Sequence, residues 1–177
     1  LISIAHPYLQ HLVNLTNESA TLCVADGDEV HYLDQVNGSH LFHLKDWTGL
    51  RFPMHCVSDG KVFLAFRPSE QTEAYLSRPM QKFTKNTITD PAKMRKELQT
   101  IRESGYAWTN GEYNLDGVGV AVPIRDENNH VIASICLFGQ VHRFPTLNRA
   151  QKYIAMTTDI GLKISAKLKS LGWGGTR

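Results

Sequence analysis

The chain has 177 residues, of which 42% are hydrophobic and 20% are charged. This composition fits one globular domain with a core of its own and excludes a disordered segment. The 19 Lys and Arg residues nearly balance the 17 Asp and Glu residues, for a net charge of +2, which disfavours direct nucleic-acid binding by this stretch. We therefore expect residues 1–177 to form a single domain.

The cysteines and the apolar pattern indicate a cellular compartment. Cys23, Cys56 and Cys136 are an odd number and contain no CxxC pair, which predicts free thiols in a reducing compartment and hence a cytoplasmic protein. No run of about 18 apolar residues and no signal-peptide pattern is present, so we expect no membrane partner. The first residue is Leu1 rather than Met, from which we expect a further segment upstream.

The first part of the chain predicts a helix, a β-hairpin and a second helix. Apolar residues at helical spacing follow Pro7, and Ile2 continues the same stripe backwards. The turn at Asp26-Gly27-Asp28 separates two strand patterns, as in a hairpin. A loop with Gly49 and Pro53 then leads into a helix that ends before Pro68. The predicted elements are a helix over residues 7–17, strands over 20–24 and 30–36, an ambiguous segment over 41–44 and a helix over 58–66.

The second part predicts two further helices on either side of three strands, after a small helix over 70–76 capped by Ser69. The clearest helix signal has Asp90 as N-cap, Pro91 as the first helical residue and Gly105 directly after the end. The remaining predicted elements are strands over 106–109, 118–125 and 131–138 and a helix over 146–171. This order predicts an α+β fold with an antiparallel sheet between helical layers.

Metal, nucleotide and cofactor sites are not predicted. Eight histidines are present, but His40 and His43 would lie on opposite faces of a strand, and His55 diverges from the adjacent Cys56. A structural or surface role is therefore favoured for the histidines. Gly60-Lys61 resembles the end of a phosphate loop, yet residue 55 is not glycine and residue 62 is Val62, which excludes that motif.

A cysteine nucleophile is the enzymatic alternative. Cys136, in an apolar strand, could meet His55 or Cys56 in space. Apolar neighbours raise a thiol pKa, however, and no nearby cation or helix end lowers it, so a small buried hydrophobe is the favoured role for Cys136. We therefore do not expect an enzyme.

The loop that runs into the helix at Ser58 is a candidate anion site. If Ser58 caps this helix, the backbone amides of Gly60 and Lys61 point at a place where a carboxylate can bind, and Gly60 lets a ligand approach the backbone. The alternative is an ordinary capped helix with a surface lysine. The residues alone leave both interpretations open.

Four sets of residues together resemble the effector-binding domain of IclR-type bacterial transcriptional regulators. They are Pro53-Met54-His55-Cys56 with Gly60-Lys61, then Ile101-Arg102-Glu103-Ser104-Gly105-Tyr106-Ala107, then Ala121-Val122-Pro123-Ile124 with Ala133-Ser134-Ile135, and finally Gly139 with Arg143. The resemblance spans essentially the whole chain and is carried by the order and spacing of these motifs.

The resemblance implies a GAF-like domain, an antiparallel sheet flanked by helices, that binds a small organic acid. It further implies self-assembly into a dimer or tetramer, and contact with DNA only through an N-terminal winged helix-turn-helix domain that is absent from residues 1–177. The ligand would lie between the sheet and the loop before Ser58. Carried over position by position, and with Gly60 added from the helix start, the implied lining is Leu41, Leu44, Phe52, Ser58, Asp59, Gly60, Thr109, Gly119, Cys136 and Phe138.

Two features of this chain depart from the family pattern. Asp116 and Gly111-Glu112 differ from the usual residues, which leaves the register of 109–119 open by about one position. Asp59 replaces a small or apolar residue, and its carboxylate would repel an anion unless it is protonated, points away or accepts a hydrogen bond from a ligand hydroxyl. The size of Phe138 favours an aromatic or medium-sized hydroxylated acid; alternatively its ring fills the cavity and leaves room only for a small acid. A stand-alone GAF-like sensor, a cysteine-dependent enzyme and a scaffold without a ligand are the other hypotheses.

Overall fold

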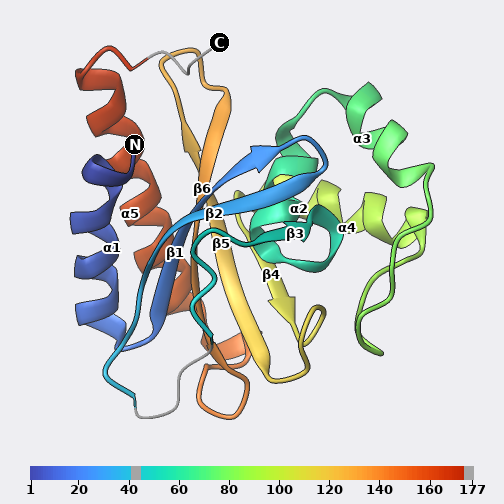
Figure 1. The fold of residues 1–177 in the computed structure, drawn as a ribbon, viewed down its shortest axis with the longest axis horizontal. Coiled ribbons are helices and arrows are strands. Elements are labelled where there is room, and N and C mark those ends of the chain that lie inside the picture. The colour runs from blue at the N-terminus through green and yellow to red at the C-terminus, as the bar shows by residue number, and fades with distance from the viewer. Residues whose placement is uncertain (41–44, 174–177) are drawn as a thin grey trace.

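The computed structural model describes residues 1–40 and 45–173. Its centre is a six-stranded sheet in the order β3-β2-β1-β6-β5-β4, in which every neighbouring pair is antiparallel (Figure 1). The strands are β1 (Ser19–Asp26), β2 (Glu29–Val36), β3 (Arg51–Pro53), β4 (Ala107–Asn110), β5 (Gly117–Arg125) and β6 (Val131–Gln140). The predicted α+β class with an antiparallel sheet is confirmed.

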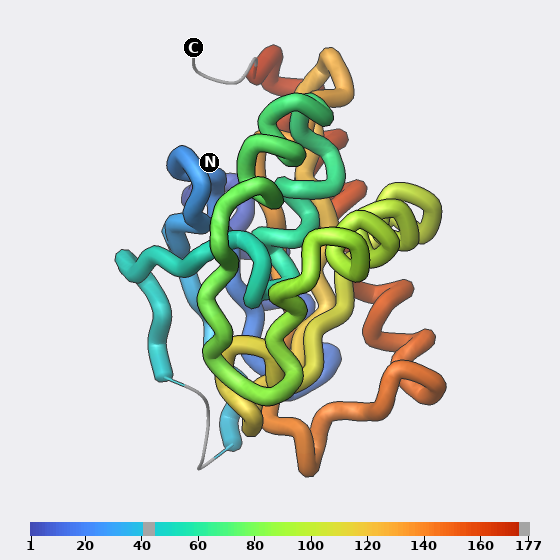
Figure 2. Tube along the Cα trace, turned by 90° about the vertical axis from the view of Figure 1, so that its right-hand side faces the viewer, coloured from blue at the N-terminus to red at the C-terminus, as the bar shows by residue number. Residues whose placement is uncertain are grey.

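Helices cover both faces of this sheet. Helices α1 (Ile2–Thr16) and α5 (Gln151–Ser170) pack against one face, and α2 (Ser58–Phe66), α3 (Ser69–Leu76) and α4 (Pro91–Ser104) lie on the other side (Figure 1). Figure 2 views the molecule from the side of α3 and α4, with α5 behind the sheet. Short 3-10 helices precede α2 (Met54–Cys56) and α5 (Leu147–Arg149).

The alternation of side chains along the central strands divides the core into two layers. Val120, Val122 and Leu137 pack in the layer under α1 and α5, whereas Ala121 and Cys136 face α2. Each large apolar side chain buried in this way contributes about 1.5–3 kcal/mol relative to an exposed one. The layer next to α2 contains smaller residues at the centre of the sheet, and this is where the candidate site lies.

The capping signals of α4 are confirmed. The Asp90 carboxylate accepts a hydrogen bond from the backbone N–H of Lys93 at 2.7 Å, Pro91 is the first helical residue, and Gly105 ends the helix with φ at 80°. Glycine adopts a left-handed backbone conformation without the steric cost of a Cβ atom, so Gly105 is a favourable residue to end the helix. The hairpin of β1 and β2 also forms as predicted, with a left-handed Gly27 in its turn.

The three largest differences from the predicted elements are in α1, β3 and α5. Helix α1 begins at Ile2 and continues through Pro7, because Ala5 and Leu9 on either side of the proline are fully buried and their packing outweighs the lost hydrogen bond. Strand β3 forms where the sequence predicts a loop, since three residues are too few for an alternation signal; its proline is at the edge of the sheet, where a missing N–H is tolerated. Helix α5 begins at Gln151 instead of residue 146.

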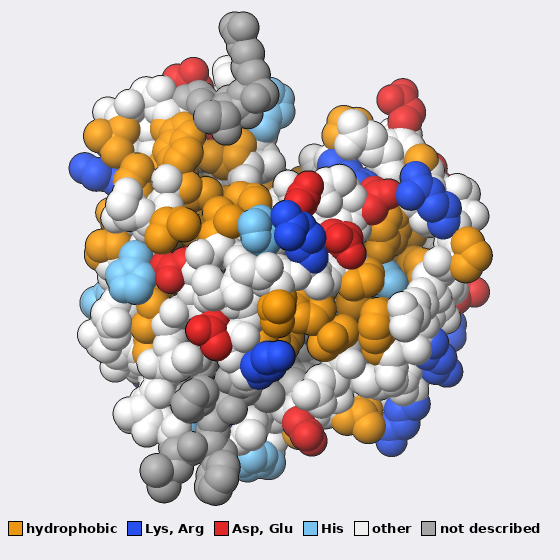
Figure 3. Space-filling view, in the orientation of Figure 1, with side chains coloured by type: hydrophobic (Ala, Val, Ile, Leu, Met, Phe, Trp, Pro, Cys, Tyr) orange, Lys and Arg blue, Asp and Glu red, His pale blue; other side chains and the backbone are white. Residues whose placement is uncertain are grey.

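Charges of both signs are mixed on the face seen in Figure 3, with hydrophobic side chains between them. This distribution agrees with the near-balanced net charge and gives no single-sign face in that view. Among the described helices, none combines the length and the hydropathy needed to cross a bilayer.

Candidate functional site

A cavity of about 50 Å³ lies between the sheet and the start of α2. This exceeds the roughly 10–15 Å³ that one water molecule needs. Six of the ten predicted site residues line it: Ser58, Asp59, Thr109, Gly119, Cys136 and Phe138. Phe52 and Gly60 are nearby but outside the lining, and the predictions for Leu41 and Leu44 fall outside the described residues.

The sheet supplies the floor of the cavity. Cys136 and Phe138 are two residues apart on β6 and face the same side, as predicted. Gly119 pairs with Phe138 on one side and with Thr109 on the other, which fixes the register that the sequence left open. A Cβ atom at Gly119 would lie 3.0 Å from the Cys136 sulfur and 3.2 Å from the Phe138 Cβ, so glycine keeps this floor open.

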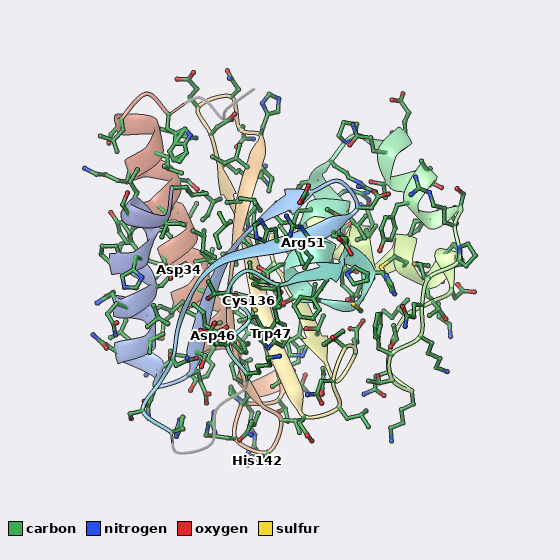
Figure 4. All side chains as sticks on the ribbon, viewed as in Figure 1. Asp34, Asp46, Trp47, Arg51, Cys136 and His142 are labelled. Carbon is green, nitrogen blue, oxygen red and sulfur yellow. The ribbon has the colours of Figure 1, made fainter. Side chains whose placement is uncertain are left out.

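Aromatic rings form one wall. The ring of Trp47 lies 5.7 Å from that of Phe138 and 6.0 Å from that of Tyr113. Trp47 comes from the loop before β3 and Cys136 from β6, and Figure 4 shows both over the central part of the sheet. Phe52 packs against Trp47 at 4.8 Å and Tyr113 at 4.7 Å, so it supports the wall from outside the lining.

The start of α2 differs from the predicted capping. Ser58 is the first helical residue, Val57 occupies the N-cap position, and no side chain caps the helix. The Lys61 N–H donates to the Val57 carbonyl at 3.1 Å. This amide is therefore not available to an anion, contrary to the prediction. The amides without an intrahelical acceptor are those of Ser58, Asp59 and Gly60. The Ser58 hydroxyl instead lies 3.3 Å from the Cys136 sulfur.

Gly60 has a packing role next to the cavity. A Cβ at this position would collide with the backbone of Met54, so glycine allows the turn Met54–Cys56 to pack closely against α2. The sequence predicts that a ligand can approach the Gly60 backbone closely. On this side of Gly60 the backbone of Met54 occupies that space.

Asp59 is almost completely buried, with 1% of its surface exposed. Its Oδ2 accepts a hydrogen bond from the Tyr32 hydroxyl at 3.1 Å. No hydrogen bond within normal geometry reaches its Oδ1 among the described residues, and the nearby Ser134 hydroxyl donates to the Val122 carbonyl. Burial raises the pKa of the Asp59 carboxyl to about 6, against the lowering effect of Ser134, Cys23 and Tyr32.

Lys61 is fully buried, which overturns the interpretation of an ordinary capped helix with a surface lysine. Its ammonium donates to Glu112 Oε1 at 2.7 Å and to Glu97 Oε1 at 3.2 Å. Glu112 lines the cavity, and its Oε2 has no hydrogen-bond partner among the described residues. Burial raises the pKa of Glu112, and the Lys61 charge opposes this rise.

The thiols do not form a catalytic pair. Burial raises the pKa of Cys136 well above its usual range and that of Cys56 to about 12. The ring of His55 is held by the Tyr75 hydroxyl and the Gln81 carbonyl, each at 2.8 Å, and burial lowers its pKa. His55 is thus a satisfied buried histidine. Within residues 1–40 and 45–173, no group of three or more His, Cys, Asp or Glu residues could hold a metal ion.

Sequence reasoning missed most of the polar and aromatic lining. The additional residues are Thr21, Tyr32, Trp47, Cys56, Val57, Glu112, Tyr113, Asn114, Gly117 and Val118. Tyr32 is two residues after Val30 on β2, and this spacing is sufficient to place both side chains on the same buried face. Trp47 and Glu112 are in loops, and only their tertiary contacts bring them to the cavity.

This fold and cavity define a small-molecule-binding domain, and comparison with known proteins identifies its family. Residues 1–166 match the family described as "Bacterial transcriptional regulator IclR C-terminal". The chain belongs to this family. It is an effector-binding domain of the kind found in transcriptional regulators, and not an enzyme.

Relatives agree over nearly the whole chain. It is 31% identical to the "Transcriptional repressor IclR" of Escherichia coli (strain K12), an alignment that covers 100% of this chain and 64% of that protein. The crystal structure of the Thermotoga maritima IclR is similar, with a TM-score of 0.89, 31% identity and coverage of 97% of this chain and 68% of that one. The chain therefore spans less than two thirds of the curated repressor.

A third relative was solved with a ligand. It is an IclR homologue from Microbacterium hydrocarbonoxydans complexed with 4-hydroxybenzoate, with a TM-score of 0.87 and 25% identity, covering 96% of this chain and 68% of that one.

Proposed function

We propose that residues 1–177 form the single ligand-sensing domain of a cytoplasmic transcriptional regulator. The domain binds a small carboxylic acid, aromatic or hydroxylated, in the cavity beside α2 and transmits the signal to a DNA-binding domain that precedes Leu1. The observation that carries this proposal is the cavity itself, which lies between the start of α2 and the strand surface that carries Gly119, Cys136 and Phe138. The IclR homologue complexed with 4-hydroxybenzoate supports the ligand class.

The start of α2 is suited to a carboxylate. The amides of Ser58 and Asp59 lack intrahelical acceptors, and the positive end of the helix dipole favours an anion there. The hydroxyls of Ser58 and Thr109 line the same cavity and can donate further hydrogen bonds. Leu41 and Leu44, which fall outside the described residues, remain proposed parts of the lining.

The size of the cavity restricts the ligand. At about 50 Å³ the space fits a small acid as it stands, and a ring-bearing acid requires the side chains of Trp47 and Phe138 to turn. Both rings then offer flat surfaces for stacking, and such pairs contribute about 0.5–1.5 kcal/mol beyond the area they bury.

The loop with Trp47 and the helix α1 are the elements proposed to carry the signal. Trp47 lines the cavity, so a bound ligand changes the packing of this loop against a partner subunit in a homodimer or tetramer. Helix α1 packs on β1, β2 and α5 and directly follows the proposed DNA-binding domain. A coupling free energy of about 1–3 kcal/mol between ligand and operator is sufficient.

A thermal-denaturation screen tests this function. The chain is heated with a panel of small and aromatic carboxylic acids that includes 4-hydroxybenzoate and amino- and hydroxy-substituted alkanoates. An acid present at 100 times its Kd should stabilise the domain by about 2.7 kcal/mol. Full-length protein is then titrated on its operator with and without the stabilising acid. A domain that no acid stabilises, or an operator affinity that saturating acid leaves unchanged, contradicts the proposal.

A further inference from the structure

A β-bulge in β2 turns Gln35 toward the side of the sheet that carries the cavity. The register between β1 and β2 skips Leu33, and an extra residue of this kind reverses the alternation of side chains beyond it. Tyr32 accordingly packs in the layer next to α2, whereas Val36 packs in the layer under α1 and α5. Gln35 is paired with Thr21, which lines the cavity, so both side chains are on the cavity side of the sheet.

The loop that carries Trp47 is attached to β2 where β3 no longer pairs with that strand. Strand β3 pairs with residues 29–31 of β2. Beyond them, the Gly49 N–H donates to the Tyr32 carbonyl at 2.8 Å. Further along, the side chain of Gln35 takes the place of a neighbouring strand. Its Oε1 accepts a hydrogen bond from the Trp47 N–H at 3.0 Å, and its Nε2 lies 3.4 Å from the Lys45 carbonyl. Residues 45–50, the Trp47 loop, are thus joined to β2 at two places.

A chain of hydrogen bonds leads from Gln35 to the end of α1. A backbone N–H only donates, so the Gln35 atom opposite Trp47 must be the acceptor Oε1. The Gln35 amide nitrogen donates to Asn37 Oδ1 at 2.7 Å, and the same oxygen accepts from the Ser19 hydroxyl at 3.1 Å. Ser19 is the first residue of β1, and α1 ends at Thr16. The cavity wall is therefore connected to the junction of α1 and β1.

A second contact ties the same junction to the residues that follow β2. Asn17, the left-handed residue that ends α1, accepts hydrogen bonds at Oδ1 from the N–H and the hydroxyl of Ser39, at 2.8 and 2.9 Å. A Cβ atom at Gly38 would collide with the Asn17 backbone, so the two segments are in close contact. The junction of α1 and β1 thus packs directly against the stretch that contains Asn37.

Gln35 fixes the place of a side chain that closes the cavity. The residues on either side of Trp47 are exposed, and its ring is half-buried at 5.4, 4.8 and 5.7 Å from the rings of Tyr32, Phe52 and Phe138. Apolar contacts are non-directional and let a ring turn, whereas a hydrogen bond has a defined geometry. The bond to Gln35 therefore holds the Trp47 backbone in one position.

We infer that Gln35 is a positioning residue: it holds Trp47 in the cavity wall and joins it, through Asn37, to the junction of α1 and β1. Gln35 itself lies outside the lining. This inference rests on the proposed function and names the side chain through which the size of the accepted acid is controlled. A small acid fits with the Gln35 bonds intact. A ring-bearing acid needs Trp47 displaced, and the Gln35 bonds keep the population of that open form low.

Fluorescence of Trp47 tests this role without a ligand. The chain has three tryptophans, and Trp108→Phe together with Trp173→Phe leaves Trp47 as the single emitter. In this background Gln35→Met keeps the length of the side chain and removes its amide bonds. It should raise the acrylamide quenching constant of Trp47 at least about twofold, the population shift expected for one lost hydrogen bond. Gln99→Met, at an exposed glutamine of α4 bonded to Glu103, is the control and should leave the constant unchanged.

Two further variants distinguish positioning from a general loss of stability. Gln35→Glu retains an acceptor for the Trp47 N–H and should keep Trp47 as shielded as in the parent. Asn37→Ala removes the acceptor of the Gln35 amide while Gln35 stays in place, and it should raise the quenching. Urea denaturation of each variant gives its stability. Quenching that follows the urea midpoints, instead of the presence of the bond to Trp47, overturns the positioning role.

The acid specificity of Gln35→Met tests the consequence for the ligand. Acetate and 4-hydroxybenzoate are titrated calorimetrically onto the unmodified chain and onto the variant. The affinity for 4-hydroxybenzoate should rise at least about threefold, because the fraction of the domain with an open wall limits the apparent affinity for a ring-bearing acid. The affinity for acetate should not rise.

The outcomes separate this inference from the function on which it rests. Equal quenching in Gln35→Met and in its parent, or an equal rise in Gln99→Met, overturns the role of Gln35 whatever the acids do. An unchanged preference between the two acids overturns its control of ligand size. If neither acid binds either protein at up to about 10 mM, a range of negligible specific affinity, the proposed function fails for both acids, and the quenching of Trp47 still decides whether Gln35 positions it.

Discussion

Lys61 Nζ lies 2.7 Å from Glu112 Oε1 at a position where the lysine side chain has no exposed surface. Lys61 belongs to α2, Glu112 follows β4, and the second partner, Glu97, belongs to α4 and is about one third exposed. The ammonium therefore joins three elements directly behind the cavity. Removing one partner of such a buried pair leaves the other as an uncompensated buried charge.

Replacement of this lysine should destabilise the whole domain. We expect Lys61→Met to lower the free energy of unfolding by about 3–5 kcal/mol, because Glu112 then remains buried without its cation. Urea denaturation followed by circular dichroism measures the change. The control is Arg95→Met, which removes an exposed arginine paired with Glu73 and should leave the midpoint unchanged within error. Equal midpoints for Lys61→Met and the unmodified chain would contradict the energetic role of the pair.

Asp59 should make the domain less stable at neutral pH than in mild acid. Its pKa is about 6 in the folded chain and 3.8 in its ordinary environment, so between these values the folded state binds a proton that the unfolded state has lost. The stabilisation from this proton is complete below about pH 4 and disappears as the pH rises to about 6. A difference of this size corresponds to about 3 kcal/mol.

The variant Asp59→Asn isolates this contribution from that of Glu112, whose pKa burial also raises. Asparagine cannot ionise, so the variant should be up to about 3 kcal/mol more stable than the unmodified chain at pH 7, and the gain should shrink towards pH 4. Denaturation curves of both proteins across this pH range give the difference directly. A constant difference at all pH values would show that Asp59 does not titrate in this window.

Gly119 should control access to the floor of the cavity. The Cβ of Gly119→Ala would lie 3.0 Å from the Cys136 sulfur and 3.2 Å from Phe138 Cβ, so we expect ligand affinity to fall at least about tenfold through lost space, with the fold retained. Val120→Ala is the matched control: it faces α1 and α5 on the opposite layer and should cost about 2 kcal/mol of stability without changing affinity. Calorimetry and urea denaturation of the two variants separate these effects. A loss of ligand affinity in Val120→Ala but not in Gly119→Ala would place the ligand elsewhere.

Local signals predict much of the fold. Asp90, Pro91 and Gly105 define α4 because capping depends on neighbouring residues only, and the hairpin turn at Gly27 is equally local. The two-residue period of a strand is sufficient to place Cys136 and Phe138 on one face of β6. These predictions need no knowledge of distant contacts.

The rest depends on tertiary contacts that a single sequence does not contain. Lysine is usually exposed, and only the approach of Glu112 and Glu97 from other elements makes a buried Lys61 tolerable. Trp47 reaches the cavity by packing against Tyr32 of β2 and Phe138 of β6, contacts that loop composition does not specify. For the same reason the sequence does not show that Asp59 and Glu112, 53 residues apart, line one cavity.

The three cysteines should react slowly in the folded domain, which bears on the enzymatic alternative. All three are buried and free, and the pKa of Cys56 is raised to about 12 by burial. At this pKa roughly one thiol in 10⁵ is ionised at pH 7, and the thiolate is the nucleophile. Burial raises the pKa of Cys23 and Cys136 as well, and the one side-chain partner of the Cys136 sulfur within the described residues is the Ser58 hydroxyl, which is not a base.

We therefore expect a chromogenic disulfide reagent to label the native chain at least about 100-fold more slowly than the urea-unfolded chain, in which all three thiols are accessible and have ordinary pKa values. The unfolded sample also counts the thiols and serves as the internal control. Labelling of native Cys136 at the unfolded rate, identified by mass spectrometry of the peptides, would mean that its environment supports a thiolate. The cysteine-dependent mechanism would then have to be reconsidered, because a cavity lined by a reactive thiol is suited to covalent chemistry rather than to reversible binding alone.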